Sequence, residues 1–191
     1  VSNIAFDQTG HGFQGILGAA RIVSAPCGNA LRFGPNNNVH EFTVPPFYPP
    51  LNIVGAMTGM AMIRPLGLQS TDDNPGCQEG TIFSKGGNYW FQISKNNKQL
   101  VFQNVGGGAA AVADIQSCIG HWMHVAFVRE ADGRTVRFYK NGAPIGSPTT
   151  LPTLGNANND PLMVGNHGFA NDPGACEFNG DIDEIRIFDR A

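Results

Sequence analysis

Short runs of alternating hydrophobic and polar residues recur along the whole chain of 191 residues, separated by glycine, proline, asparagine and aspartate. This alternation has the two-residue period of half-buried β-strands, and no stretch of helix length repeats with a period of 3.6 residues. The number and spacing of these runs predict an all-β fold, namely a two-sheet antiparallel β-sandwich or jelly roll. We expect strands near residues 4–6, 13–17, 30–33, 41–44, 57–63, 81–84, 89–94, 100–105, 122–129, 135–140, 161–165 and 178–187.

The closing stretch, residues 176–191, contains the strongest strand pattern in the chain. Phe178, Ile182, Ile185 and Ile187 are apolar positions with charged residues between them. Glycine followed by aspartate at 180–181 predicts a bend or a β-bulge near the start of this strand. A terminus that ends in a strong strand would fray unless it were paired on both sides, so we expect it inside a sheet.

Four other stretches give specific expectations. The apolar run 57–63 predicts a strand buried on both faces. Residues 106–117, rich in glycine and alanine, predict a loop, and the prolines of 45–50 predict an irregular surface connection. Asn141-Gly142 between two apolar runs is a strong signal for a type I′ β-hairpin.

Composition excludes several classes of function. Charged residues are 14% of the chain and the net charge is −3, with no basic cluster, so no nucleic acid partner is expected. No apolar run reaches transmembrane length, so membrane insertion is not expected either. The chain begins at Val1 rather than Met, which we interpret as a mature secreted protein or a module of a larger one. Residues 1–191 fit one β-sandwich domain, and no internal repeat or domain boundary is visible.

The four cysteines are widely spaced and contain no CxxC pair. Zinc sites usually show short paired spacing, so two disulfides in an oxidising compartment are the favoured interpretation, with four buried thiols as the alternative. Three connectivities are possible, and they involve Cys27, Cys77, Cys118 and Cys176.

Five motifs, taken together, resemble the laminin G-like domains of the concanavalin A-like lectin/glucanase superfamily. They are GHWMHVA (120–126), VRFYKNG (136–142), FNGDIDEIRI (178–187), DQTGHG (7–12) and ALRFG (30–34). The resemblance spans nearly the whole chain. It implies a β-sandwich of two antiparallel sheets with adjacent first and last strands, and an extracellular module of the kind that binds glycans and is appended to secreted enzymes or adhesins.

The resemblance also implies a disulfide arrangement. In this topology the strand that ends at Pro65 runs antiparallel to the last strand. That placement brings the loop with Cys77 near Cys176, so pairing of Cys77 with Cys176 and of Cys27 with Cys118 is preferred.

Members of the family often hold a structural calcium ion where the first and last strands meet. Calcium prefers carboxylate and carbonyl oxygens. The matching positions are Asp7, the carbonyls around Gly10 and His11, and Asp183. The alternatives are that Asp7 caps an Asx-turn and that Asp183 is a strand-edge charge.

The acidic residues of the closing strand raise the possibility of a hydrolase. Laminarinase-like enzymes, which share this architecture, place carboxylates in an E-x-D-x-x-E pattern along one strand. Here the corresponding positions are Asp181, Asp183 and Arg186, so the acid/base carboxylate is missing. GxSxG and HExxH motifs are also absent, and His121 and His124 are spaced to lie on opposite faces of a strand. We therefore expect no catalytic residues.

Sugar binding requires flat aromatic surfaces beside amide and carboxylate groups. In the strand 89–94, alternation assigns Tyr89, Phe91 and Ile93 to the core. Trp90 and Gln92 then face solvent or a concave surface, unless Trp90 packs under a neighbouring loop. Trp122 matches a family position that is normally in the core.

Two polar rim loops complete the predicted ligand-binding set. Its members, beside Trp90 and Gln92, are Asp72, Asp73, Asn166, His167, Asn171 and Asp172, although these loops could equally be solvated turns. The sequence thus predicts a secreted, non-catalytic carbohydrate-binding module or lectin with a structural calcium site and a glycan or polysaccharide partner. The alternatives are a protein-binding adhesion module with an extracellular protein partner and a divergent polysaccharide hydrolase or lyase.

Overall fold

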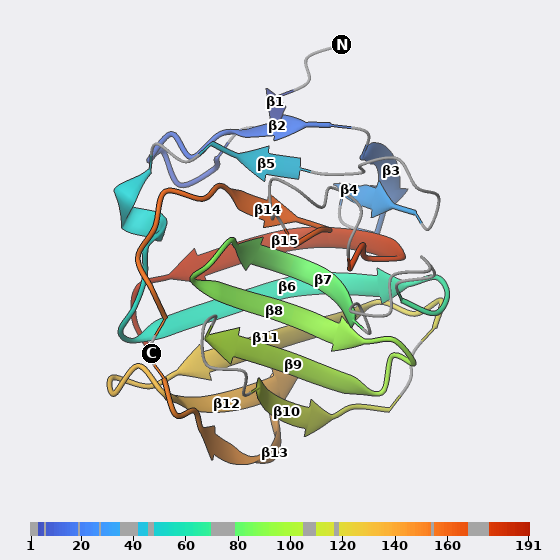
Figure 1. The fold of residues 1–191 in the computed structure, drawn as a ribbon. Coiled ribbons are helices and arrows are strands. Elements are labelled where there is room, and N and C mark those ends of the chain that lie inside the picture. The colour runs from blue at the N-terminus through green and yellow to red at the C-terminus, as the bar shows by residue number, and fades with distance from the viewer. Residues whose placement is uncertain are drawn as a thin grey trace.

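The computed structural model describes most of the chain and shows two β-sheets stacked face to face (Figure 1). The described residues are 4–5, 7–18, 20–26, 28–34, 42–45, 48–69, 79–104, 110–116, 119–153, 155–167 and 176–191. No helix in these ranges is long and apolar enough to span a membrane. The predicted all-β antiparallel sandwich is confirmed.

The first sheet has eight strands in the order β1-β2-β5-β14-β7-β8-β9-β10 and faces the viewer in Figure 1. Every neighbouring pair is antiparallel. The strands are β1 (Ile4–Ala5), β2 (Gly15–Leu17), β5 (Phe42–Val44), β14 (Leu162–Val164), β7 (Glu79–Lys85), β8 (Tyr89–Ser94), β9 (Gln99–Asn104) and β10 (Ala110–Asp114).

The second sheet has seven strands in the order β13-β12-β11-β6-β15-β4-β3, also antiparallel throughout. A 3₁₀ turn at Pro49–Leu51 interrupts the proline-rich connection that leads into it. The strands are β13 (Ala143–Thr150), β12 (Thr135–Lys140), β11 (Met123–Arg129), β6 (Met57–Pro65), β15 (Gly180–Phe188), β4 (Gly28–Phe33) and β3 (Arg21–Ala25).

The closing strand β15 lies inside its sheet, as predicted, between β4 and β6. Its antiparallel pairing with β6, the strand that ends at Pro65, is also confirmed. The expectation that the first and last strands are adjacent is wrong. β1 pairs with β2 at the edge of the eight-stranded sheet, whereas β15 belongs to the other sheet.

Two details of the central strands differ from the sequence predictions. β6 is not buried on both faces, because buried and half-buried residues alternate along it and Met60, Met62 and Arg64 point away from the core. The irregularity in β15 comes between Asp183 and Arg186 rather than at Gly180, and Glu184 there has a positive φ of 48°. The outward-facing Met60 and Met62 hid the first feature, since methionine counts as apolar in the sequence pattern.

Strands β3 and β10 were not predicted from sequence. β10 lies in the stretch expected to be a loop, and its register opposite β9 places Ala111 in the core beside Phe102. Small side chains suffice there because large aromatic residues of β8 and β9 already fill the space. The predicted Asn141-Gly142 hairpin is confirmed, with φ values of 50° and 81° as a type I′ turn requires.

An aromatic cluster fills the space between the sheets. Phe127 of β11 packs against Phe102 and Phe91, with ring centroids 4.3 Å and 5.0 Å away, and Phe83 lies 6.2 Å from it. These side chains are fully buried. Gly59 of β6 lies directly beneath them, because a Cβ at this position would come within 2.5 Å of Phe127 and 2.6 Å of Phe83.

One end of the core is closed by the fully buried Arg129. Its guanidinium donates to the carbonyl oxygens of Gly55 and Ile53 and to Asn104 Oδ1, each at 2.7 Å. Burial lowers the pKa of Arg129 to about 10, which leaves it charged at neutral pH. A buried charge without such partners would be costly, so Arg129 ties the 53–55 connection to β9 and β11.

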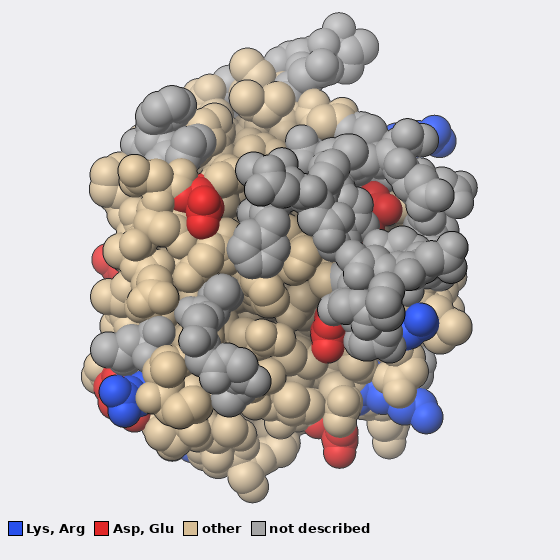
Figure 2. Space-filling view, viewed as in Figure 1, with Lys and Arg blue, Asp and Glu red and all other residues tan. Residues whose placement is uncertain are grey.

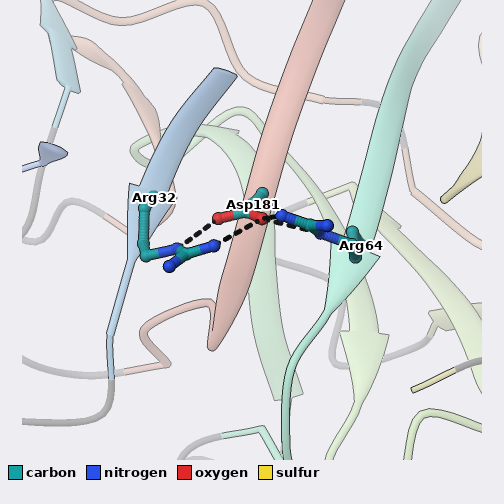
Figure 3. Close-up of polar contacts among 3 residues, drawn as sticks. All are labelled: Arg32, Arg64 and Asp181. Carbon is teal, nitrogen blue, oxygen red and sulfur yellow. Dashed lines mark hydrogen bonds and ion pairs between the residues drawn. The ribbon is translucent and has the colours of Figure 1, made fainter. Parts of the chain in front are cut away.

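The outer face of the seven-stranded sheet holds an ion cluster across three strands (Figure 3). Asp181 of β15, whose side chain has no exposed area, lies between Arg32 of β4 and Arg64 of β6. Arg32 Nε donates to Asp181 Oδ1 at 2.7 Å, and Arg64 Nε donates to Oδ2 at 2.8 Å. Burial alone would raise the pKa of the Asp181 carboxyl, but the hydrogen bonds and charges of the two arginines hold it below its usual value.

Replacement of Gly59 should overpack the core. We expect Gly59→Ala to lower the free energy of unfolding by about 1–3 kcal/mol, because Phe127 and Phe83 must leave their positions. Urea denaturation measures this change. Gly55→Ala is the matched control, since a Cβ there meets nothing within 4 Å, and equal stability of the two variants would contradict the packing described above.

Removal of the Asp181 charge should destabilise the sheet. Asp181→Asn leaves two arginines without their carboxylate, so we expect a loss of about 3–5 kcal/mol at neutral pH. Because the folded-state pKa is lowered, the contribution of Asp181 is complete above about pH 4 and declines as the pH falls through the folded-state pKa.

The stability difference between the natural chain and Asp181→Asn should therefore shrink in acid. Denaturant titrations at several pH values between 7 and 2 measure this difference. Asp189→Asn, at an exposed position near the C-terminus, is the control and should change little at any pH. A difference that stays constant with pH would show that the charge of Asp181 is not what stabilises the sheet.

Candidate functional site

Trp90 of β8 lies on the outer face of the eight-stranded sheet, opposite the core. Alternation along β8 buries Tyr89, Phe91 and Ile93 completely, as predicted, and leaves Trp90 half-buried on the other side. The strand register places Ser84 of β7 and Gln103 of β9 on either side of it. The indole Nε1 donates to the carbonyl oxygen of Gly86 at 2.7 Å, which fixes the orientation of the ring.

His167 is held against Trp90 by the segment that follows β14. The two ring centroids are 4.9 Å apart, with an angle of 57° between the ring planes. Gly165 N–H donates to Ile82 O at 3.1 Å and Ser84 Oγ donates to Asn166 O at 3.0 Å, so the segment is fastened to β7.

The turn at Gly165 requires glycine. Its φ is +77°, and a Cβ would lie 2.1 Å from the ring of Phe33. Any other residue would shift the backbone that carries His167. We call Trp90, His167, Ser84 and Gln103 the Trp90 cluster.

Three residues predicted to contact ligand are buried, namely His167, which is 9% exposed, Gln92 and Asn166. Gln92 is 1% exposed and its Nε2 donates to Thr81 Oγ1 at 3.3 Å, so the expectation that it faces solvent is wrong. Its Oε1 is buried and has no hydrogen-bond partner in the described part of the chain. Asn166 is 1% exposed, and its Oδ1 accepts the backbone N–H of His167 at 2.6 Å, so it supports His167 rather than forming a surface.

The surface around the Trp90 cluster carries little charge. In Figure 2 the blue atoms lie toward the edges of this face, and a few red groups interrupt the mostly tan described surface. The strand residues nearest to Trp90 on this face are uncharged, including Thr43, Met163, Val101 and Val112, whereas Glu79 and Asp114 occupy the same face farther along β7 and β10. A half-buried indole among uncharged polar and apolar groups can stack on an apolar ring face and accept or donate hydrogen bonds to hydroxyl groups.

The remaining residues of the predicted rim loops, Asp72, Asp73, Asn171 and Asp172, lie outside the described residues. Their role in ligand binding stays a prediction.

The loop after β1 is organised by Asp7, as an Asx-turn. Its Oδ1 accepts the backbone N–H of Thr9 at 2.9 Å and its Oδ2 accepts Thr9 Oγ1 at 2.7 Å and Phe13 N–H at 3.3 Å. Burial would raise the pKa of Asp7, but these hydrogen bonds lower it below the usual value. His11 Nδ1 lies 2.8 Å from Thr9 Oγ1 in the same loop.

The residues predicted to bind calcium belong to two separate elements. Asp7, Gly10 and His11 belong to the connection between β1 and β2 of the first sheet, whereas Asp183 lies in β15 of the second. Asp183 Oδ1 accepts the N–H of Glu184 at 2.8 Å. Within the described ranges, no three His, Cys, Asp or Glu side chains gather where they could hold a metal. The calcium ion and its predicted ligand set both stay predictions.

The acidic residues of β15 are arranged for structure. Asp181 is enclosed by Arg32 and Arg64, and Glu184 forms an ion pair with Arg186 at 2.7 Å. A carboxyl with a lowered pKa and two guanidinium partners is a poor general acid at neutral pH. This agrees with the absence of the E-x-D-x-x-E pattern from the sequence.

Cys176, at the start of the closing segment, is disulfide-bonded. Its carbonyl oxygen accepts the N–H of Thr81 at 2.8 Å, which fastens this segment to β7. Cys27, Cys77 and Cys118 lie outside the described residues, so the pairing of the cysteines stays a prediction.

Sequence reasoning missed three contributions to the Trp90 cluster. Ser84 and Gln103 follow from strand register, which the sequence does not reveal, and Gly165 follows from its contact with Phe33. Trp122 was assigned to the core, but it is half-buried on the outer face of the second sheet, where the guanidinium of Arg64 lies 5.2 Å from its ring centroid.

Solved structures with this fold include several binding proteins. Domain 4 of AbnA, an extracellular GH43 arabinanase from Geobacillus stearothermophilus in complex with arabinotriose, is 21% identical, with a TM-score of 0.63 over 95% of this chain and 84% of that one. A carbohydrate-binding protein described as putative, from Bacteroides ovatus, is 18% identical, with a TM-score of 0.63 over 85% of this chain and 43% of that one.

Mouse laminin α1 chain domains LG4-5 are 14% identical, with a TM-score of 0.54 over 88% of this chain and 41% of that one. This chain therefore spans less than half the length of two of the three structures. At these identities the likeness establishes the fold alone, and no curated protein sequence matches the chain.

A family model described as the concanavalin A-like lectin/glucanases superfamily matches residues 58–191, from β6 to the end of the chain. This match covers more than half of the sequence and includes the hairpin and closing-strand motifs that carried the resemblance. The chain belongs to this family of laminin G-type domains within the concanavalin A-like lectin/glucanases superfamily.

Proposed function

We propose that this domain is a non-catalytic carbohydrate-binding module and that its ligand contacts the Trp90 cluster. The observation that carries the proposal is the fixed, half-buried indole of Trp90, held by Gly86 O and by the ring of His167 on the outer face of the eight-stranded sheet. A sugar offers apolar C–H faces and hydroxyl edges, which such a surface complements.

Pre-organisation of the indole supports the proposal. Its Nε1 hydrogen bond and its contact with His167 restrict the ring before a ligand arrives. Binding then loses less side-chain entropy than it would with a freely rotating aromatic residue. Solved structures of the same fold are described as carbohydrate-binding or are bound to oligosaccharides, which gives further support.

We also propose that the module acts outside the cell. The disulfide of Cys176 favours an oxidising compartment, and the structural neighbours include a domain of an extracellular arabinanase.

Catalysis is not part of the proposal, because the carboxylates of β15 are engaged with arginines or with the backbone.

Truncation of Trp90 should abolish most of the binding. A panel of neutral and acidic oligosaccharides, with arabinotriose among them, identifies a ligand, and isothermal titration calorimetry then measures its affinity. We expect Trp90→Ala to weaken binding about tenfold or more, which corresponds to about 1.4 kcal/mol. Val112→Ala, an exposed position on the same sheet face, is the control and should bind normally.

Equal affinity of Trp90→Ala and the natural chain would contradict the assignment of the site. Failure of every glycan, together with capture of an extracellular protein partner, would instead favour the adhesion-module alternative.

We expect His167 to support ligand binding by packing its ring against Trp90 and not by exchanging a proton with the ligand. We expect His167→Ala to weaken ligand binding several-fold because Trp90 loses the ring that packs against it, while His167→Phe retains most of the affinity. Tryptophan fluorescence of the unliganded protein provides a second measurement, since Trp90 should become more mobile only in His167→Ala. A loss of affinity in both variants would show that an imidazole nitrogen contacts the ligand directly.

A further inference from the structure

A row of cationic side chains crosses the outer face of the seven-stranded sheet, on the opposite side of the sandwich from Trp90. Arg21 of β3 is the direct cross-strand partner of Arg32 in β4, and Arg32 is opposite Asp181, which is opposite Arg64. Direct cross-strand partners project from the same face of a sheet. Beyond Arg64 the row ends at Trp122, whose ring packs on the Arg64 guanidinium.

The charges of this row do not balance. Arg21, Arg32 and Arg64 carry three positive charges, and Asp181 supplies one negative charge between the last two. Asp183, at the next outward-facing position of β15, is the nearest further carboxylate on that strand, and its Oδ1 already accepts the N–H of Glu184. Glu184 pairs with Arg186 farther along. Among the described residues, a local excess of positive charge therefore remains along this row, in a chain whose net charge is −3.

The pair of Arg21 and Arg32 is the least compensated part of the row. Like charges directly opposite each other in an antiparallel pair repel and destabilise it. Among the described residues no carboxylate forms an ion pair with Arg21, which is exposed at the edge strand. Arg32 is bonded to Asp181 through Nε and Nη2, and its side chain remains 41% exposed.

The remaining donors suit an oxoanion. Nη1 of Arg32 makes no hydrogen bond to Asp181, and Arg21 is an exposed residue. Asp181 holds Arg32 by two contacts, so this fork is fixed before any ligand binds. Carboxylate and sulfate groups match the planar geometry of guanidinium donors and would relieve the repulsion between the two arginines.

We propose that Arg21 and Arg32 form an oxoanion-binding site for a carboxylate or sulfate group. Arg64 and Asp181 position Arg32, and Trp122 packs on Arg64. The site is separate from the Trp90 cluster and does not depend on the function proposed for it. Acidic sugars and free inorganic anions both carry the required group.

NMR titration of the folded domain with three probes tests the site at low ionic strength. The probes are glucuronate, inorganic sulfate and neutral glucose, and the Nε–Hε signals of Arg21 and Arg32 report binding. We expect glucuronate or sulfate, but not glucose, to shift these signals, and we expect the affinity to fall as sodium chloride is added. Preference for glucuronate would identify an acidic sugar as the source of the group, and equal binding of sulfate would identify a simple anion.

Three variants separate this site from general electrostatics. Arg21→Gln should weaken anion binding about tenfold, and Arg21→Lys should retain part of it because the charge remains without the planar fork. Arg134→Gln, in the exposed turn between β11 and β12, changes the net charge equally and should have no effect. Trp90→Ala should also leave anion binding unchanged.

The proposal would be overturned if neither anion shifted the arginine signals, or if Arg21→Gln and Arg134→Gln weakened binding to the same extent. Because Arg21 lies at an exposed edge, its variants should fold normally, which a thermal melt confirms.

Discussion

A carboxylate that is cut off from water has to be held by opposite charge, and in this domain that requirement falls on Asp181. Its partners come from both neighbouring strands, so one side chain links β4, β15 and β6 at a fixed register. A slip of one residue in β15 would turn Asp181 into the core and Ile182 outward. The ion cluster and the hydrophobic core therefore specify the same register, and an unpaired Asp181 would be costly in any other arrangement.

The two sheets therefore have different roles in the structure. The seven-stranded sheet carries the ion cluster and the central strand pairing of β15 with β6. The eight-stranded sheet receives the closing segment through Cys176 O, bonded to Thr81, and through the contact of Phe178 N–H with Gly165 O. Gly165 in turn begins the segment that sets His167 against Trp90. The segment that supports His167 in the proposed sugar site is thus bonded directly to the residues that precede β15.

Much of the fold could be predicted because hydrophobic alternation and turn residues act locally. The strands β8, β11 and β12, and the Asn141-Gly142 hairpin, follow from such patterns. The prediction missed β10 because a stretch rich in glycine and alanine is typical of a loop. Its small side chains can form a core strand only because aromatic residues of β8 and β9 fill the space beside them. The prediction placed the bulge of β15 at Gly180 because glycine is a usual sign of a bulge. Glu184, which has a positive φ where the bulge occurs, carries no such sign in the sequence.

The candidate site was less predictable, since burial on an outer sheet face is decided by non-local segments. Alternation correctly placed Trp90 and Gln92 on one face of β8, yet Gln92 is buried and Trp90 is only partly so. Period-two reasoning distinguishes the two faces of a strand but cannot show which face residues a distant connection will cover. His167 illustrates the same limit, since it contacts Trp90, which lies 77 positions earlier in the chain. This contact depends on the hydrogen bonds that join Gly165 and Asn166 to β7, and the sequence does not reveal them. A binding surface on a sandwich of this kind is therefore a property of register and connections together, and single-strand patterns can identify its aromatic residue without identifying the residues that surround it.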